Sequence, residues 1–288
     1  MKRDLVVSNK KMINAMSVDV EDYFQVSAFE SVIDRASWDN LECRVERNTH
    51  KALALFDDAN IKATFFVLGW VADRYPALVG EIVANGHELA SHGYSHRRIT
   101  TLDKKQFRDE VRTSKAILED LGGVNVKGYR APSYSIVEST LWAHEILAEE
   151  GYRYSSSVYP IKHDLYGIPD ASRFSYEIPA LGLTEIPVST IEMYGRNFPC
   201  GGGGYFRLFP YRLSRWAIER VNQQEGNPCN FYFHPWELDP DQPRQKNIPV
   251  KTRFRHYLNL RRMESRLQRL LKDFSWGTME EVYLGASQ

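Results

Sequence analysis

The stretch from Ala63 to His96, ATFFVLGWVADRYPALVGEIVANGHELASHGYSH, decides the fold. It opens with a run of β-branched and aromatic residues over 63–68, which predicts a buried strand. Residues 76–85 follow as a helix with proline in its first turn and a glycine just past its end. Residues 87–91 then form a second, shorter strand. This order indicates parallel strands joined by a crossover helix.

The same alternation extends on both sides of this unit. A strand over 12–20 and a helix over 47–59 precede it. The next helix is predicted to start at Asp103, because Gln106 stands three residues later as in a capping box, and to end at Gly122-Gly123. Further elements are predicted at 127–131, 139–150 and 153–157. The pattern predicts an α/β fold whose polar residues gather at the carboxyl ends of parallel strands.

The second half of the chain is less regular. Residues 159–204 are rich in Pro and Gly, contain one convincing strand over 184–189 and end in four glycines. We interpret them as a long excursion that ends in a flexible substrate loop, because no GxxxxGK[ST] motif supports a phosphate loop. A helix over 211–224, a strand over 230–233 and one basic helix over 253–272 follow, and the charges of that last helix are interpreted as a solvated face.

Composition excludes several classes of protein. The chain has 288 residues, of which 43% are hydrophobic and 26% charged, as in folded globular proteins rather than disordered ones. Lys plus Arg and Asp plus Glu both number 37, so the formal net charge is zero. No overall field attracts such a chain to nucleic acid or to an anionic membrane, and we expect neither as a partner.

Cysteine usage and the lengths of apolar runs indicate the cellular compartment of the protein. Cys43, Cys200 and Cys229 are odd in number and show no CxxC spacing, which favours reduced structural thiols over disulfides or a thiolate zinc site. The first apolar stretch, 5–7, is too short for a signal-peptide core. No run approaches the roughly 18 apolar residues of a membrane span. We therefore expect a cytoplasmic protein without an integral membrane segment.

Two imidazoles and three carboxylates follow predicted strands. His92 and His96 come directly after the strand at 87–91, and on a helical turn their i, i+4 spacing would point both rings the same way. Asp19, Glu21 and Asp22 stand at the end of the first strand. Two histidines and one carboxylate match a catalytic zinc-type site with open positions, and a second carboxylate can act as general base.

The metal carboxylate stays open between two residues. On an extended segment Asp19 and Glu21 face one side and Asp22 faces the other, which favours Glu21. A turn after Asp19 would bring Asp22 round instead. A further pair, Asp57-Asp58, is rejected because it ends a predicted helix.

Two later segments also put polar residues at the ends of strands. Arg130 lies in Tyr-Arg-Ala-Pro-Ser-Tyr, residues 129–134, and His234 lies in Phe-Tyr-Phe-His-Pro-Trp, residues 231–236. Singly, a structural salt bridge and a hydrogen-bonded core histidine would explain them. Because all of these segments are predicted to meet at one edge of the sheet, a shared active site is the stronger interpretation.

The order of these segments resembles the NodB-type polysaccharide deacetylases of carbohydrate esterase family 4, over roughly residues 12–240. The HxxxH motif of that family is intact at 92–96. The RxPxG motif is present at 130–134 with tyrosine in place of glycine, and the late LxxH motif at 231–234 with phenylalanine in place of leucine. The TFDDG motif departs most, because residues 18–24 read VDVEDYF.

The resemblance implies a distorted (β/α) barrel with its active site at the carboxyl ends of mostly parallel strands. It implies Asp19 as base, Arg130 as the residue that orients Asp19, His234 as the acid that protonates the leaving amine, and the backbone N–H of Tyr134 as an oxyanion donor. It also implies a divalent ion, Zn²⁺ first and Co²⁺, Ni²⁺ or Mn²⁺ as alternatives, held by His92, His96 and either Glu21 or Asp22.

The segment 18–24, the loop GGYFR at 203–207 and the tail from Leu260 to Met279 are similar to one subgroup, the deacetylases of exosortase-linked exopolysaccharide loci. That likeness covers nearly the whole chain. We therefore predict an N-terminal extension over 1–11 and a single deacetylase domain over 12–288, with a core over 12–240 and a C-terminal helical extension over 250–288.

The implied activity is removal of N-acetyl groups from hexosamine residues of a polysaccharide or its lipid-linked precursor, an acetylated glycan. Four aromatic residues are predicted to stack on sugar rings: Tyr23, Tyr205, Phe206 and Trp236. Tyr134 is placed beside them as a substrate contact. Two alternatives stay open, a cyclic ureide or imide hydrolase of the same fold and a non-catalytic carbohydrate-binding protein. The sequence leaves the oligomeric state open.

Overall fold

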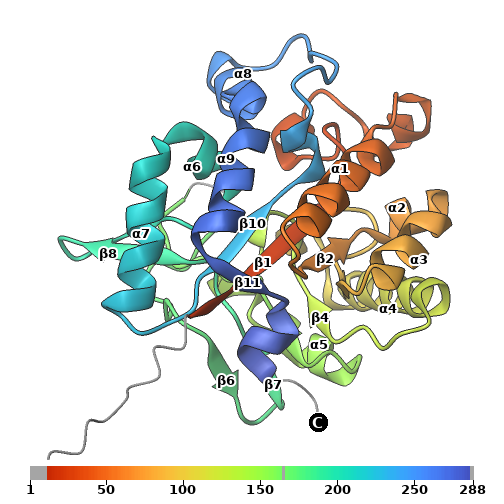
Figure 1. The fold of residues 1–288 in the computed structure, drawn as a ribbon. Coiled ribbons are helices and arrows are strands. Elements are labelled where there is room, and N and C mark those ends of the chain that lie inside the picture. The colour runs from red at the N-terminus through yellow and green to blue at the C-terminus, as the bar shows by residue number, and fades with distance from the viewer. Residues whose placement is uncertain (1–11, 164–165, 286–288) are drawn as a thin grey trace, which may run out of the picture.

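One curled sheet dominates the structure, a computed structural model that describes residues 12–163 and 166–285. In the described residues the sheet has nine strands in the order β10-β1-β2-β3-β4-β5-β7-β6, and β11 also pairs with β1. All neighbours are parallel except β6 and β7. The strands are β1 (Ile13–Val20), β2 (Thr64–Val67), β3 (Glu88–Ser91), β4 (Gly128–Tyr129), β5 (Tyr154–Ser155), β6 (Tyr176–Ile178), β7 (Leu183–Glu185), β10 (Asn230–Phe233) and β11 (Ser275–Gly277). The predicted α/β fold with mostly parallel strands is confirmed (Figure 1).

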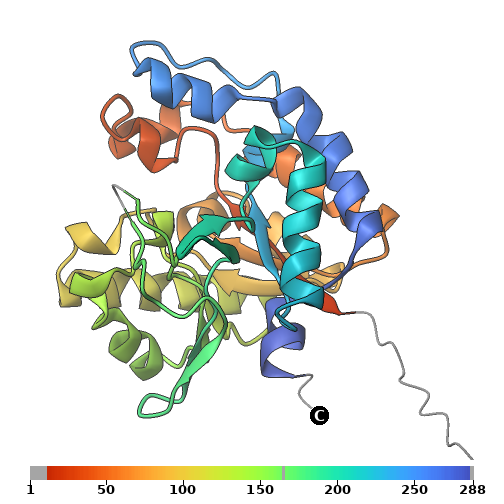
Figure 2. The same cartoon turned by 90° about the vertical axis from the view of Figure 1, so that its left-hand side faces the viewer.

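Helices follow most of the strands. They are α1 (Val45–Asp58), α2 (Gly69–Arg74), α3 (Pro76–Ala84), α4 (Lys104–Gly122), α5 (Ala143–Glu149), α6 (Gly203–Leu208), α7 (Tyr211–Gln223), α8 (Val250–Tyr257) and α9 (Leu260–Asp273). Figures 1 and 2 show α8 beyond the carboxyl end of β10, on the same side of the molecule as the segment that follows β1. None of the described helices is long and apolar enough to cross a membrane.

Alternation along β1 separates the apolar core from the interior of the curled sheet. Val18 and Val20 belong to the main apolar cluster, which α1 and α9 cover with residues such as Phe56 and Leu267. The intervening residue Asp19 faces the other side, where polar groups gather. Because side chains on a strand alternate with a period of two, one strand contributes both to the core and to a polar interior.

Several local signals in the sequence predicted elements closely. The N-cap Asp103 accepts from the backbone N–H of Gln106, as a capping box requires, and α4 ends where Gly123 adopts a left-handed φ of 63°. The predicted strand at 230–233 coincides with β10, and α7 differs by one residue at its end from the helix expected at 211–224. Residues 1–11, the predicted extension, lie outside the described residues.

The predicted basic helix over 253–272 is wrong, because the chain turns inside it. Helix α8 ends at Tyr257, and α9 begins after Asn259, whose left-handed φ of 53° breaks the helical path. The Nδ2 of Asn259 donates a 2.7 Å hydrogen bond to the carbonyl oxygen of Arg207. This contact with a distant segment fixes the turn, and nothing in the local periodicity indicates it.

The tetraglycine segment is also different from the prediction of a flexible loop. Gly203 begins α6, and a Cβ atom there would lie 2.3 Å from Oε1 of Glu237. The glycine therefore permits close packing of α6 against a buried carboxylate. The excursion before it contains β6, β7 and a two-stranded hairpin, β8 (Thr190–Met193) with β9 (Arg196–Pro199), in place of one strand over 184–189.

Candidate active site

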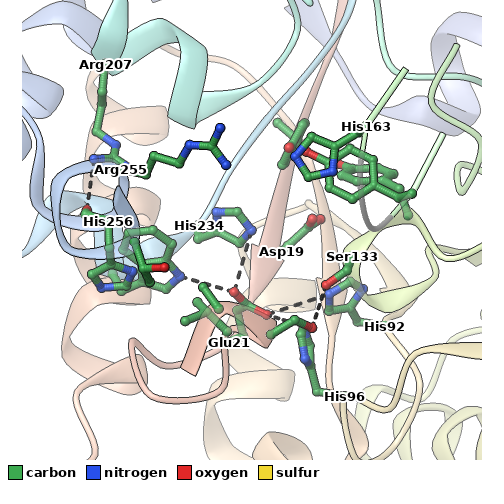
Figure 3. Close-up of a pocket in the computed structure, with 18 of the residues that line it drawn as sticks. Asp19, Glu21, His92, His96, Ser133, His163, Arg207, His234, Arg255 and His256 are labelled. Atoms are coloured by element: carbon green, nitrogen blue, oxygen red, sulfur yellow. Dashed lines mark hydrogen bonds and ion pairs between the residues drawn. The ribbon is translucent and has the colours of Figure 1, made fainter. Parts of the chain in front are cut away.

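The carboxyl ends of β1, β3 and β10 surround a pocket of about 480 Å³ (Figure 3). Most of the residues singled out in the sequence line it, together with residues of α6 and α8. The lining relevant to chemistry comprises Asp19, Glu21, His92, His96, Ser133, Tyr134, His163, Tyr166, Arg207, Tyr232, His234, Trp236, Arg255 and His256. Segments separated by more than two hundred residues thus contribute to one site.

One carboxylate and two imidazoles form the centre of the pocket. Glu21 Oε2 lies 2.5 Å from His96 Nε2 and 4.0 Å from His92 Nε2. One donor atom from each residue lies within 4.8 Å of the other two, and all three side chains are buried. Among the residues that the structure describes, this is the only group of three or more His, Cys, Asp or Glu side chains placed to hold a metal ion.

The contacts around this group leave donor atoms available to a metal. His92 Nδ1 donates a 2.9 Å hydrogen bond to the carbonyl oxygen of Arg130, so Nε2 faces Glu21 with a free lone pair. Burial lowers the pKa of His92 to about 4, which keeps the ring neutral. His96 Nδ1 is buried without a hydrogen-bond partner, and the close neighbours of the buried Glu21 Oε2 are the two imidazoles. Two imidazole nitrogens and a carboxylate oxygen therefore fit a divalent ion of the zinc type.

His96 reaches the site through an irregular loop, and the helical turn predicted for the HxxxH motif is wrong. Gly93 and His96 both have left-handed φ values, 76° and 53°. Glu110, on α4, holds the loop by accepting from the backbone N–H groups of Tyr94 at 3.1 Å and Ser95 at 2.9 Å. The two imidazoles converge because of this loop geometry.

Asp22 does not join the histidines, so its predicted role as an alternative metal ligand is wrong. Its carboxylate accepts from the backbone N–H groups of Tyr23 at 2.8 Å, Arg44 at 2.5 Å and Val45 at 2.8 Å. These contacts cap the start of α1. Burial raises the pKa of Asp22 to about 6, although the three backbone hydrogen bonds oppose that rise. Of the two carboxylates left open by the sequence, the structure brings only Glu21 to the histidines.

Asp19 is held by a buried guanidinium group. Arg130 is fully buried, and its Nη1 donates to Asp19 Oδ1 at 2.6 Å. Further donors of Arg130 contact Ser17 Oγ at 2.9 Å and the carbonyl oxygen of Ser156 at 3.2 Å. The guanidinium carbon also lies 4.0 Å from the centre of the Phe66 ring. These contacts fix the oxygen Oδ1 of Asp19, and the Asp19 side chain lines the pocket.

His234 lies between two carboxylates at the end of β10. Its Nδ1 is 2.8 Å from Glu237 Oε1, and its Nε2 is 3.6 Å from Glu21 Oε1. Burial alone would lower the pKa of His234, but the two carboxylates outweigh burial and raise it to about 9. Burial would likewise raise the pKa of Glu21, yet His96 and His234 hold it well below its usual range. His234 is thus a protonated group facing the pocket.

Sequence reasoning missed the residues that support His234. The buried Arg207 donates through Nε to Glu237 Oε2 at 2.6 Å, and through Nη1 to the carbonyl oxygens of His256 at 3.0 Å and Leu258 at 2.7 Å. Burial would raise the pKa of Glu237, but Arg207 and His234 lower it to about 2. Glu237 follows His234 by three residues, and this capping spacing is the one signal in the sequence that indicates the contact.

Trp236 is a pocket residue, but it also organises the site. Its Nε1 donates to Glu21 Oε1 at 3.1 Å. Its ring stacks on His234, with centroids 5.1 Å apart, and on His256 at 4.3 Å.

Tyr134 lines the pocket as predicted, but its backbone N–H donates to the carbonyl oxygen of Ala131 at 3.0 Å. That N–H is engaged within its turn rather than presented to an oxyanion.

Two of the predicted sugar-stacking residues are wrong. Phe206 is 1% exposed and packs edge-on against Phe231 in the core, with centroids 5.2 Å apart. Tyr23 is 2% exposed and packs in the same way against Phe24. Tyr205 instead faces a cavity next to the active-site pocket. Adjacent residues on the short helix α6 point in different directions, so their identity alone did not decide which one was accessible.

Comparison with known proteins adds a family to this geometry. Residues 36–155 match the family model "Polysaccharide deacetylase", and residues 156–284 match a domain of unknown function, DUF3473. The chain is 36% identical over 98 residues to a peptidoglycan-N-acetylglucosamine deacetylase of Bacillus cereus, which covers 34% of this chain and 36% of that protein. It is 32% identical over 108 residues to a peptidoglycan deacetylase of Helicobacter pylori, which covers 38% and 36%.

A solved structure has the same fold. The crystal structure of a candidate polysaccharide deacetylase from Mycobacterium smegmatis matches 93% of this chain and 87% of its own, with a TM-score of 0.61 and 19% identity. Residues 36–155 therefore match a polysaccharide deacetylase domain, and the predicted resemblance to the NodB-type deacetylases of carbohydrate esterase family 4 is confirmed. The matched regions span about a third of the length of the two curated relatives.

Proposed function

We propose that this chain is a metal-dependent hydrolase that removes N-acetyl groups from hexosamine residues of a polysaccharide or its lipid-linked precursor, in exopolysaccharide synthesis. One observation carries the proposal. The cluster of Glu21, His92 and His96 lies in one pocket with two differently supported groups, Asp19 on Arg130 and His234 on Glu237. Amide hydrolysis needs a base and an acid in separate electrostatic environments, and this pocket provides both.

The cluster of Glu21, His92 and His96 would hold the ion, with Zn²⁺ first and Co²⁺, Ni²⁺ or Mn²⁺ as alternatives. A bound divalent ion lowers the pKa of water and polarises a carbonyl group. The remaining roles belong to the side chains around the cluster. The hydrogen bond from His92 Nδ1 to a backbone carbonyl and the contact from Trp236 to Glu21 fix the orientation of the ligands.

Asp19 is the base in the proposed reaction. It accepts a proton from the attacking water while the water oxygen bonds to the acetyl carbon. His234 then donates its proton to the amide nitrogen as the carbon–nitrogen bond breaks, which releases acetate and a free amine. Arg130 keeps Asp19 oriented, and Glu237 keeps His234 protonated through Nδ1.

The chain 12–288 is proposed to form a single domain, although two family models divide it near residue 155. Strands β7, β10 and β11 belong to the later segment, yet β7 pairs with β5 and both β10 and β11 pair with β1. Because strands of both segments pair within one sheet, the boundary between the two family models is not a boundary between two sheets. The extension 250–288 also contributes α8 and α9, and α9 is packed in the main core.

Metal analysis of the purified protein tests the proposal without knowledge of the glycan. Elemental mass spectrometry of the wild type should find about one divalent ion per chain. His92→Ala should lose it, whereas Asp22→Asn, which changes a carboxylate outside the cluster, should retain it. An absence of metal from the wild type even after incubation with zinc or cobalt would contradict the assignment.

Acetate release then tests the reaction. Acetylated chito-oligosaccharides and exopolysaccharide fragments should yield free acetate with the metal-loaded protein. A cyclic ureide or imide hydrolase opens a ring and releases no acetate. A carbohydrate-binding protein would bind the same glycans without turnover. The three functions left open by the sequence therefore give three different results.

A further inference from the structure

A second cavity of about 300 Å³ adjoins the active-site pocket. The two share several wall residues, among them His163, Tyr166, His234 and Arg255. Most of the remaining wall comes from α6 and α8, which contribute Tyr205, Leu208, Lys251 and Phe254. Asp19, Glu21, His92 and His96 do not line it. This cavity is therefore beside the reacting centre, on the side of His234.

The charges of the second cavity are unbalanced. Arg255 and Lys251 are exposed cations that make no hydrogen bond or ion pair with any residue in the described part of the chain. Arg207, the other guanidinium in the wall, is already paired with Glu237. Among the described residues of the lining, Glu237 is the only carboxylate, and it is already paired with Arg207 and His234. Figure 3 shows Arg255 extending from its helix over the pocket, near His234.

We propose that the second cavity binds an anionic group of the glycan, next to the hexosamine that loses its acetyl group, and that Arg255 recognises this group. The proposal rests on the proposed deacetylase function and deepens it. A guanidinium group forms paired hydrogen bonds with planar or tetrahedral oxyanions. The anion is therefore either the carboxylate of a uronic acid residue or the phosphate that joins a sugar to a lipid carrier. Lys251 adds a second positive charge at the same wall.

The composition of the walls supports a sugar rather than a bare ion as the occupant. Tyr166, Tyr205 and Phe254 present aromatic surface in the same cavity as the two free cations. Aromatic faces pack well against the apolar faces of pyranose rings, while cations bind substituents at the ring edge. The reacting acetamido group belongs at Asp19 and the metal cluster, so the cavity fits the neighbouring residue of the chain.

Calorimetric binding measurements on the full chain test this inference. The probes are neutral chitotetraose, a tetrasaccharide that alternates N-acetylglucosamine with glucuronate, and N-acetylglucosamine with and without a 1-phosphate group. The wild type should bind at least one anionic probe about tenfold more tightly than its neutral counterpart. Arg255→Gln should abolish that preference, and Arg255→Lys should restore part of it. Arg253→Gln, on the same helix but outside both cavities, is the matched control and should behave as the wild type.

Each result decides a separate point. A preference for glucuronate identifies a uronate polymer, and a preference for the phosphate identifies a lipid-linked precursor. Equal affinity for neutral and anionic probes, or a preference that survives Arg255→Gln, overturns the inference. Equal losses in Arg255→Gln and Arg253→Gln, together with binding to phosphatidylglycerol vesicles, would show that α8 contacts a membrane surface instead, and would also overturn it.

The proposed function is tested by a separate measurement, the release of acetate. Acetate release from neutral chitotetraose depends on the metal cluster and not on Arg255. If acetate is released while neutral and anionic probes bind equally, only the inference falls. If an anionic probe binds through Arg255 and no glycan yields acetate, the anion site stands and the proposed hydrolysis falls.

Discussion

The two halves of the active site are built in different ways. Up to residue 155 the functional side chains stand on or just after the strands of a parallel sheet, as Asp19 and His92 do. After residue 155 the functional side chains depend on one another. Arg207 holds Glu237, and Glu237 holds His234. The first half is positioned by strands of the sheet and by one buried pair, Arg130 with Asp19, whereas the second half depends on two linked pairs that share Glu237.

We infer from this difference that the two halves of the site have different roles, one in the chemical reaction and the other in substrate selectivity. The first half presents the proposed metal cluster and the proposed base, groups that tolerate little displacement, because catalytic geometry must be held to fractions of an ångström. The second half presents the proposed acid together with the cavity under α8. Charge pairs and short helices can vary without disturbing the sheet. We therefore expect changes in the first half and at His234 to abolish turnover, and other changes in the second half to alter stability and substrate preference.

The largest effect is expected for Asp19→Asn. This change keeps the size of the side chain but removes the proposed base, so kcat should fall about 100- to 10,000-fold. The metal content should stay unchanged, because Asp19 is outside the ligand cluster. Acetate release and elemental analysis on the same preparation measure both. Asp57→Asn, at the end of α1, is the control and should retain full activity. Full turnover in Asp19→Asn would show that another group accepts the proton.

The first half of the site was largely predictable from the sequence for a physical reason. Strand ends converge in any parallel sheet, so residues that follow strands, such as Glu21 and His92, could be placed together from local patterns alone. The capping box at Asp103 and the helix end at Gly123 depend only on neighbouring residues, and both were predicted correctly. Local interactions carry enough information to fix such features.

The second half was not predictable in the same way. The pair Arg207 and Glu237 is 30 residues apart in the chain, and neither residue lies in a motif that points to the other. Asn259 breaks the predicted basic helix because its side chain contacts a distant carbonyl group. Tyr205 and Phe206 lie on different faces of α6, and the position of β10 determines which of the two is accessible. Contacts between distant segments determine the ion pair, the helix break and the accessible face of α6. The hydrophobic periodicity of the sequence does not indicate such contacts.

The next largest effects are expected for the two buried guanidinium groups, Arg130 and Arg207. Replacing either with methionine removes the guanidinium partner of a buried carboxylate, so each variant should lose about 3–5 kcal/mol of unfolding free energy. Their local consequences should differ. Arg207→Met also frees two carbonyl oxygens that end α8, and should increase hydrogen exchange over 250–258, whereas Arg130→Met should leave exchange there unchanged. Urea unfolding and exchange mass spectrometry measure the two quantities.

Neutralising the partner carboxylate controls this comparison. The double variants Arg130→Met/Asp19→Asn and Arg207→Met/Glu237→Gln remove the unpaired charge, so each should recover part of the stability lost in its single variant. If Arg130→Met instead loosened residues 250–258 as strongly as Arg207→Met does, the two halves of the site would be one cooperative unit, and the distinction drawn above would fail.

Acid should reduce the contribution of His256, in the second half, to stability. Burial, together with the neighbouring Arg207, lowers the pKa of His256 to about 3, and its Nε2–H donates to Gln242 Oε1 at 2.7 Å. The unfolded chain takes up this proton near pH 6.5, whereas the folded chain does not until about pH 3. The contribution of His256 is thus complete above pH 6.5 and decreases as the pH falls. Between pH 6.5 and 5 it should shrink by about 2 kcal/mol.

Urea unfolding of the wild type and of His256→Phe, at pH 7, 6 and 5, measures this contribution. Phenylalanine keeps the stack on Trp236 but cannot be protonated. The variant should be less stable at pH 7, because it loses the hydrogen bond to Gln242, and its stability should depend less steeply on pH. Parallel pH profiles for the two proteins would show that His256 is not the neutral group proposed here.

The smallest effect is expected at the turn between α8 and α9. Asn259 has a φ of 53°, and its side chain donates to the carbonyl oxygen of Arg207. Asn259→Ala should lose about 1–2 kcal/mol, because it removes the hydrogen bond and because alanine is strained at positive φ. Asn259→Gly removes the same hydrogen bond without that strain, so it should lose less. Since the turn sets the position of α8, both variants should weaken binding of an anionic glycan through Arg255 while acetate release from a neutral glycan stays unchanged. Loss of both activities together would place α8 within the catalytic unit.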